Sequence, residues 1–157
     1  MEGVRQATED DLPRLAELAR AGIAELEPMK GGAVWAAREG RAEPLEQDLG
    51  GALRDPATRV VVGTIDEVPI GYAVVRVEQL RNGSCLGVID DIFVEDEARG
   101  VGVGEAMMAD LVAWCTEQGC VGIDAMALPG HRATKNFFEE SGFTARKLVM
   151  HHVLKER

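Results

Sequence analysis

The sequence predicts an α+β fold in which a mixed, mostly antiparallel sheet carries helices on both faces. Helical periodicity dominates residues 10–53, and short β-branched runs separated by turn signals follow over residues 58–94. Strand and helix patterns then alternate to the C-terminus, and a strand–helix–strand unit of this kind forms a right-handed parallel crossover. One parallel strand pair is therefore expected within the sheet.

Length and composition point to one folded domain over residues 1–157. The chain is long enough for a substantial core and too short for two ordinary domains, and 46% of its residues are hydrophobic. No apolar run approaches the roughly 20 residues that a membrane helix needs. The N-terminal stretch MEGVRQATEDDLPRL lacks the basic-then-apolar order of a secretory signal. We therefore expect a cytoplasmic protein with no membrane partner.

The chain is acidic, because 27 acidic and 17 basic side chains give a net charge of −10. A field of that sign repels the phosphates of nucleic acids and favours cationic small molecules or basic peptides as partners. Solubility alone explains the charge equally well. No histidine lies at metal-ligand spacing from Cys85, Cys115 or Cys120, so we expect free thiols and no metal site.

The local patterns place helices and strands along the chain. Thr8 has N-cap character, and Leu12, Leu15 and Leu18 recur at helical spacing, which predicts an amphipathic helix over residues 10–27. The other predicted elements are a helical stretch over 33–53 interrupted at Gly40 and Pro44, strands over 59–64, 70–77 and 85–94, a helix over 100–118, a strand over 121–126, a helix over 131–140 and a final strand over 143–154.

The most informative segment follows the strand that ends at Val94. A short acidic turn and Arg99 precede three alternating glycines, Gly100, Gly102 and Gly104, at the start of a helix. Glycines let successive backbone N–H groups approach an anion closely, and a helix N-terminus adds unsatisfied donors and a positive dipole end. Together these features suit a pyrophosphate. The spacing fits neither the GK[ST] ending of a P-loop nor the GxGxxG of a dinucleotide-binding loop.

The spacing R-x-x-G-x-G, present as Arg99–Gly104, resembles the cofactor signature of the GCN5-related N-acetyltransferase (GNAT) family. The run Asn136–Phe143 is similar to the family's helix that ends in aromatic-Glu-x-x-Gly-Phe, and the order of elements matches over most of the chain. The resemblance implies a GNAT-like sheet with a splayed parallel strand pair, and acetyl-CoA bound as cosubstrate between those strands. It also implies transfer of the acetyl group to a primary amine of a small molecule or peptide.

The same resemblance assigns the cofactor-binding residues. In the family, main-chain groups just before the signature pair with the pantetheine arm, and Ile92, Phe93 and Val94 stand at the matching positions. The matching cradle for the pyrophosphate consists of Arg99, Gly100, Val101, Gly102, Val103, Gly104 and Glu105. Ile92 and Val94 also suit an ordinary core, and both interpretations hold together because the family uses their main chain.

Asp90 is the candidate catalytic residue. Family members often place a carboxylate or histidine on the strand before the signature, and Asp90 stands there, as a general base or as an anchor for the substrate ammonium. Strand alternation predicts that Asp90 shares a face with Ile92 and that Asp91 points to the opposite face. The alternative is a solvated or turn-capping aspartate. A carboxylate with its ordinary pKa is a poor base at neutral pH unless burial raises that pKa or a water relay helps.

Two positions depart from the family pattern. Phe138 stands where the family often has a tyrosine as general acid, and His131 where it often has an asparagine; both are still expected to contact the cofactor. The only tyrosine of the sequence, Tyr72, lies in the earlier hairpin. The missing acid supports a second interpretation, a non-catalytic acyl-CoA-binding or sensing module. A nucleotide-binding protein that uses the same loop for phosphate is a third.

Acceptor selection in the family comes from the N-terminal helices and the final hairpin. The matching segments here contain Glu25, Glu27, Trp35 and His151–His152. Acidic and aromatic side chains at these places suit an amine with an apolar body. Edge strands and the final strand offer a surface for a homodimer, and the sequence leaves the acceptor amine and the acyl-chain preference open.

Overall fold

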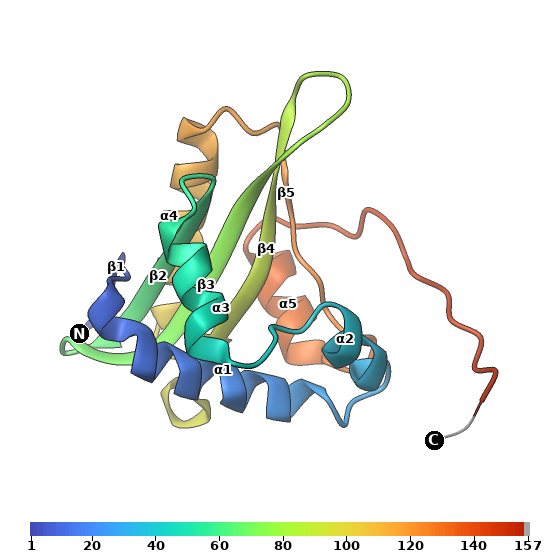
Figure 1. The fold of residues 1–157 in the computed structure, drawn as a ribbon, viewed down its shortest axis with the longest axis horizontal. Helices are drawn as coiled ribbons and strands as arrows, with labels where there is room; N and C mark the ends of the chain where they lie inside the picture. The colour runs from blue at the N-terminus through green and yellow to red at the C-terminus, as the bar shows by residue number, and fades with distance from the viewer. Residues whose placement is uncertain (156–157) are drawn as a thin grey trace.

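The computed structural model describes residues 1–155, which form a five-stranded sheet with helices on both faces (Figure 1). The strands are β1 (Glu2–Gln6), β2 (Thr58–Ile65), β3 (Val68–Gln79), β4 (Cys85–Val94) and β5 (Ile123–Asp124). The helices are α1 (Leu12–Leu26), α2 (Gly32–Arg38), α3 (Leu45–Arg54), α4 (Val103–Glu117) and α5 (Arg132–Glu140), with short 3-10 turns at Glu9–Asp11 and Asp96–Ala98. Within this part of the chain, no helix combines the length and apolarity needed to cross a membrane.

The strands lie side by side in the order β1-β2-β3-β4-β5. Each neighbouring pair is antiparallel except β4 and β5, which run parallel. The parallel pairing consists of Gly87 with Ile123 and Val88 with Asp124. β5 ends there, whereas β4 continues to Val94. This arrangement confirms the mixed, mostly antiparallel sheet with a splayed parallel pair.

Period-two alternation in the strands supplies a core on each face of the sheet. Helices α1 and α3 cover the first face, and α4 and α5 cover the second. The first core includes Leu15, Leu18, Leu49, Val60, Val62 and Val74. The second core includes Val61, Val75, Met107, Leu111 and Phe138. The two cores fix α1 and α4 on opposite sides of β4, where the cavity described below opens.

β1 is a strand that the sequence patterns do not predict. It contains a single large apolar side chain, Val4, which is too few to produce a recognisable alternation. Pairing with β2 builds the strand instead, with Val4 opposite Gly63. β1 therefore depends on tertiary contact and not on its own propensity.

The predicted final strand over residues 143–154 is wrong. The ring of Phe143 lies 5.5 Å from that of Phe138, but the backbone from Thr144 to Lys155 forms neither helix nor strand. The predicted strand over residues 121–126 is likewise reduced to the two residues of β5. A β pattern needs a neighbouring strand to become a ladder, and no strand of the described chain lies beside these segments on that side.

A β-bulge in β4 corrects the expected directions of the acidic side chains. Val74 pairs with Asp91 and Val75 pairs with Ile89, so Asp90 is an extra residue in β4. A bulge interrupts the strict alternation of a strand. The prediction that Asp91 points away from the face of Asp90 is therefore wrong, and both carboxylates line the same cavity.

The packing of α4 on β2 gives a testable prediction. A Cβ atom at Gly63 would lie 2.5 Å from Val103 Cγ1 and 2.9 Å from Met107 Sδ. We expect Gly63→Ala to lower the free energy of unfolding by about 1–3 kcal/mol, because the helix must move outward. Gly51 in α3 is the control, since no atom lies within 4 Å of its added Cβ.

In urea titrations followed by tryptophan fluorescence, Gly51→Ala should raise the free energy of unfolding by about 0.5–1 kcal/mol, the usual gain for alanine in a helix. Equal stability of the two variants would contradict the close approach of α4 to β2.

Candidate active site

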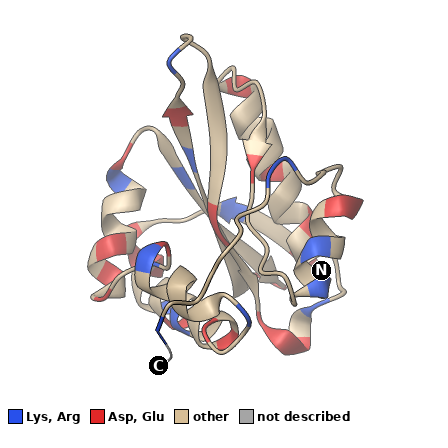
Figure 2. Cartoon of the chain, turned by 90° about the vertical axis from the view of Figure 1, so that its right-hand side faces the viewer, with Lys and Arg blue, Asp and Glu red and all other residues tan. Residues whose placement is uncertain are grey.

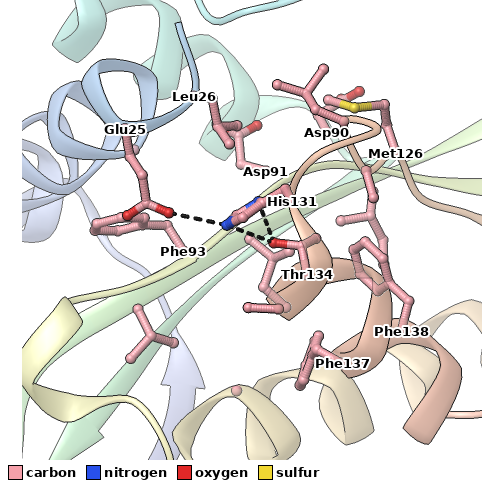
Figure 3. Close-up of a pocket in the computed structure, with 18 of the residues that line it drawn as sticks. Glu25, Leu26, Asp90, Asp91, Phe93, Met126, His131, Thr134, Phe137 and Phe138 are labelled. Carbon is pink, nitrogen blue, oxygen red and sulfur yellow. Dashed lines mark hydrogen bonds and ion pairs between the residues drawn. The ribbon is translucent and has the colours of Figure 1, made fainter. Parts of the chain in front are cut away.

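A cavity of about 500 Å³ opens where β4 and β5 separate. Figure 3 shows that its walls carry side chains from α1, β4 and α5, with Met126 from the segment after β5. Helix α2, strand β3 and the first turn of α4 complete the lining. The cavity therefore lies in the splay that the family resemblance associates with acetyl-CoA.

The edge of β4 that faces the cavity is available to a ligand. Antiparallel pairing with β3 uses one edge of β4 as far as Val94, whereas parallel pairing on the other edge stops at Val88. Ile92, Phe93 and Val94 lie beyond that point and line the cavity. Backbone N–H and C=O groups need partners when they are removed from water. An extended ligand with amide groups suits this edge.

The N-terminus of α4 forms one end of the cavity. Gly102 has a φ of 92°, a left-handed conformation that suits glycine, and its carbonyl accepts the N–H of Ala106 at 3.0 Å. The amides of Val103, Gly104 and Glu105 precede this helical bond, so they are among the donors that an α-helix leaves unsatisfied at its start. These donors and the helix dipole favour a bound anion.

Most of the predicted cofactor-binding residues line the cavity: Ile92, Phe93, Val94, Arg99, Gly100, Gly104, Glu105, His131 and Phe138. Val101, Gly102 and Val103 do not. The side chain of Val103 is buried in the core against the sheet, and that of Val101 is exposed. These residues shape the loop through their main chain.

Arg99 ties the glycine loop to the rest of the site. Its Nε donates to the carbonyl of Val94 at 2.8 Å, and its Nη2 donates to Oε1 of Glu25 at 2.7 Å. The guanidinium also stands 5.5 Å from the centre of the Phe93 ring. The arginine therefore joins the loop, the end of β4 and helix α1, and its charge is paired with Glu25 and Asp96.

Glu25 also reaches the opposite wall of the cavity. Figure 3 shows its carboxylate directed at His131, with Oε2 at 3.3 Å from Nε2. The hydroxyl of Thr134 lies 2.7 Å from Nδ1 of the same ring. The three side chains link α1 to the first turn of α5. His131 is thus held inside the site, and Thr134 is a neighbour that the sequence patterns do not single out.

Asp90 has a partly desolvated carboxylate. Its side chain is 32% exposed and accepts a hydrogen bond from Nε of Arg76 at 3.0 Å. Burial raises the pKa of Asp90 above its ordinary value, and the charge of Arg76 opposes this rise. Asp90 therefore has a carboxylate whose pKa is raised by burial and which lies beside the cation of Arg76.

Asp91 is held by a network that the sequence analysis missed. Its Oδ2 accepts the hydroxyl of Tyr72 at 2.6 Å, and Arg41 contacts both carboxylate oxygens at 3.1 and 2.6 Å. Burial, and then the charge of Asp91, raises the pKa of the Tyr72 hydroxyl well above its ordinary value. In the sequence, only the position of Asp91 next to Asp90 indicated that it belongs to the site. Arg41 and Tyr72 are distant from it along the chain, so no spacing marks their contact with Asp91.

Phe138 gives the cavity a hydrocarbon wall. It is 7% exposed, and its ring lies 5.7 Å from that of Phe137 and 5.5 Å from that of Phe143. No proton donor is available from this side chain. Phe137 in turn lies against Gly104, where an added Cβ would come within 3.2 Å of the ring. The aromatic residues of α5 therefore pack against the first turn of α4.

The residues expected to select the acceptor are only partly brought together. Glu25 and Trp35 line the cavity, whereas Glu27 does not. His151 and His152 lie in the exposed C-terminal residues. The cysteines are free thiols, and within residues 1–155 no group of three or more potential side-chain ligands is arranged to hold a metal ion.

Comparison with solved structures identifies the fold. An acetyltransferase from Trypanosoma brucei superposes with a TM-score of 0.71 at 22% identity, over 98% of this chain and 100% of that one. The enzyme AAC(6')-Iy, in complex with the bisubstrate analogue CoA-S-monomethyl-acetylneamine, gives 0.75 at 19% identity over 99% of both chains. A mutant Bacillus halodurans protein gives 0.81 at 18% identity, over 97% and 99%. At these identities the likeness establishes the fold alone.

Comparison of sequences identifies the family. The chain is 31% identical over 70 residues to the glucosamine 6-phosphate N-acetyltransferase of Trypanosoma brucei brucei, a match that covers 45% of this chain and 46% of that protein. The chain therefore spans just under half of the length of this curated relative. The model of the acetyltransferase (GNAT) family, whose members use acetyl-CoA as cosubstrate, matches residues 21–143. On this match, which includes the Arg99–Gly104 signature, the chain belongs to the acetyltransferase (GNAT) family.

Proposed function

We propose that the chain transfers an acetyl group from acetyl-CoA to a primary amine of a small molecule or peptide. One observation carries the proposal: the open edge of β4 and the N-terminus of α4 meet at a single cavity. An edge of amide groups beside a cluster of anion-binding donors matches the two polar parts of coenzyme A, its pantetheine arm and its diphosphate. The free thiols fit the reducing cytoplasm, where we place the reaction.

The residues present fit coenzyme A. Ile92, Phe93 and Val94 would hold the pantetheine arm through their main chain, and the amides of Gly104 and Glu105 would hold the diphosphate. At Gly100, which also lines the cavity, an added Cβ would meet no atom within 4 Å, so the loop surface is open to a ligand. Arg99 supplies a positive charge nearby, although Glu25 and Asp96 already pair with it. Acetyl-CoA supplies the activated thioester carbonyl.

Asp90 would hold the substrate ammonium and accept its proton. An amine must lose a proton before its nitrogen can attack a carbonyl, and a base whose pKa approaches the working pH assists most. The raised pKa of Asp90 supports this role. Asp91 is less suited to it, because Tyr72 and Arg41 already occupy its oxygens.

The departing thiolate would take its proton from solvent. Phe138 has no proton to donate, and the hydroxyl of Tyr72 is donated to Asp91 and has a raised pKa. Orientation of the amine against the thioester would then supply much of the rate.

The names of two relatives suggest candidate acceptors. One is called a glucosamine 6-phosphate N-acetyltransferase, and one structural neighbour holds an acetylneamine analogue. We propose a small-molecule amine as the acceptor here, because Glu25, Asp90 and Trp35 line the cavity. The two carboxylates would hold the ammonium group of the substrate, and Trp35 would contact its apolar part. The alternative function is a non-catalytic acyl-CoA sensor, which the phenylalanine at position 138 favours.

Thiol release from acetyl-CoA, measured with a panel of amines, tests the proposal. The panel should include amino sugars, amino sugar phosphates, aminoglycosides, polyamines and a peptide. At least one amine should accelerate thiol release, and acetyl-CoA should raise the melting temperature by mass action whereas ATP should not. Binding of acetyl-CoA without turnover on any amine would favour the sensor, and stabilisation by ATP alone would favour a nucleotide site.

The first turn of α4 gives a second prediction. We expect Gly104→Asp to weaken coenzyme A binding by at least about 100-fold in calorimetric titrations, because a carboxylate would stand beside the diphosphate and charge-assisted hydrogen bonds would be lost. Gly104→Ala is the matched control, since it adds the same Cβ against Phe137 without charge. Equal affinities of the two variants would show that the diphosphate lies elsewhere.

Asp90 gives a prediction for catalysis. Asp90→Asn should lower kcat by about 100-fold or more, the usual contribution of a general base. The affinity for coenzyme A should stay unchanged, because β4 would hold the pantetheine arm through the main chain of Ile92, Phe93 and Val94 and not through the side chain of Asp90. A kcat within a factor of three of the wild-type value would exclude Asp90 as the base.

The same variant gives a prediction for stability against pH. Burial raises the pKa of Asp90 in the folded protein above its unfolded value, so the ionised carboxylate destabilises the fold. This penalty appears as the pH rises through the unfolded-state pKa and is complete above the folded-state pKa. In urea unfolding between acidic and neutral pH, Asp90→Asn should therefore gain stability relative to wild type as the pH rises. A loss over that range would contradict the raised pKa.

A further inference from the structure

Residues 33–44, here called the α2 segment, comprise helix α2 after its first residue and the loop that leads to α3. Trp35, Glu39 and Arg41 of this segment line the cavity. The structure describes the whole segment, and none of its apolar side chains is buried. Apolar burial is the main contribution that holds an element against a protein body. The α2 segment therefore depends on other contacts to stay in place.

Arg41 supplies the contacts that reach the sheet from this segment. Its Nε and Nη2 donate to the two carboxylate oxygens of Asp91 on β4 at 3.1 and 2.6 Å, and its Nη1 donates to Asp48 on α3 at 2.9 Å. The side chain of Arg41 is 11% exposed and that of Asp91 is 12% exposed. All three nitrogens of the guanidinium are therefore used, and water screens the pair with Asp91 only weakly.

The other ion pair between the α2 segment and a distant element lies on the surface. Among the described residues, it consists of Arg20 on α1 and Glu43, whose side chains are 58% and 64% exposed. Exposed ion pairs contribute little to stability, because water and salt screen them. Arg41 is therefore the main anchor of the segment.

The partners of Arg41 are themselves fixed by the core. Asp91 accepts the hydroxyl of Tyr72 at 2.6 Å, and Tyr72 is buried on β3. Asp48 lies on α3, whose neighbouring Leu49 is part of the first core. Arg41 thus joins the α2 segment to a strand and to a helix that cannot easily follow it if it moves.

The acidic character of the chain increases the importance of this cation. The sequence contains 27 acidic and 17 basic side chains, and Figure 2 shows acidic residues spread over the helices and loops. Asp48 and Asp91 reach the guanidinium from different elements. Without the charge of Arg41, two carboxylates would face the segment, and the partly buried Asp91 would lack its cation. Removal of one partner of a buried pair is strongly destabilising.

We propose that Arg41 is a positioning residue for the amine acceptor. Its ion pairs hold the α2 segment in place, so that Trp35 and Glu39 form a fixed wall of the cavity. Coenzyme A would bind the edge of β4 and the start of α4, and neither contact needs the α2 segment. The role toward an amine rests on the proposed acetyl transfer, whereas the anchoring of the segment does not.

Hydrogen exchange of the full chain tests the anchoring without an assay of activity. In Arg41→Gln, the helical amides of residues 35–39 should exchange at least about tenfold faster than in the wild type, because the segment opens locally more often. The matched control is Arg59→Gln, which breaks a two-pronged pair with Asp110 between β2 and α4 and should leave these amides unchanged. If Arg41→Gln does not fold, Arg41→Lys replaces it. An acceleration of about threefold or more is then expected, because an ammonium cannot form the same fork.

Steady-state kinetics test the role toward the acceptor. The substrate is the amine that the wild type uses fastest among the amino sugars, amino sugar phosphates, aminoglycosides, polyamines and peptide of the thiol-release panel. Arg41→Gln should raise the KM for this amine at least about tenfold and lower kcat by a smaller factor, because binding of the amine loses its wall. The calorimetric affinity for coenzyme A should be unchanged, and Arg59→Gln should keep all three wild-type values.

Wild-type exchange of residues 35–39 in the Arg41 variants, or equally fast exchange in Arg59→Gln, would overturn the anchoring. A lowered kcat with an unchanged KM would overturn the role toward the acceptor, because Arg41 would then act on the bulge that carries Asp90. A wild type that uses no amine would refute the proposed function and with it the acceptor role. The exchange data would still decide whether Arg41 anchors the α2 segment, so the two failures are distinguishable.

Discussion

The short parallel pairing between β4 and β5 is the constraint on which the site depends. It ends at Val88 and Asp124, and beyond it the edge of β4 along the wall of the cavity is not paired with another strand. Main-chain groups away from water need hydrogen-bond partners, so this edge is prepared for a ligand that carries amides. The start of α4, held on the sheet through its close approach to Gly63, adds donors for an anion at one end of the same cavity.

The bulge in β4 gives two neighbouring aspartates different environments. Asp91 is fixed by the hydroxyl of Tyr72 and by two nitrogens of Arg41, so each of its oxygens already accepts at least one hydrogen bond. Asp90 is the extra residue of the bulge, has a raised pKa and contacts Arg76 alone. Two neighbouring titratable groups that lie in different environments are typical of catalytic sites. The buried network thus positions the bulge, and the bulge places Asp90 in the cavity.

The parts of the molecule that local sequence determines were predictable, and the parts that depend on tertiary contact were not. The helices and the mixed sheet follow from periodicity, and the structure confirms them. The family resemblance follows from the spacing of the Arg99–Gly104 signature, and the match to the GNAT family confirms it. The directions of Asp90 and Asp91 depend on a bulge that no residue pattern marks. The final strand was predicted from its β-branched and apolar residues, but a strand exists only where a neighbour pairs with it.

Nuclear magnetic resonance titration of the ¹⁵N-labelled protein with coenzyme A tests the central assignment most directly, because it reads the main-chain amides themselves. The assignment requires the largest shifts of the amide signals at Gly104 and Glu105, with a second set at Ile92 and Val94. Saturable shifts confined to other segments, or no shifts at concentrations that saturate binding by calorimetry, would contradict the claim that this cavity binds the cosubstrate.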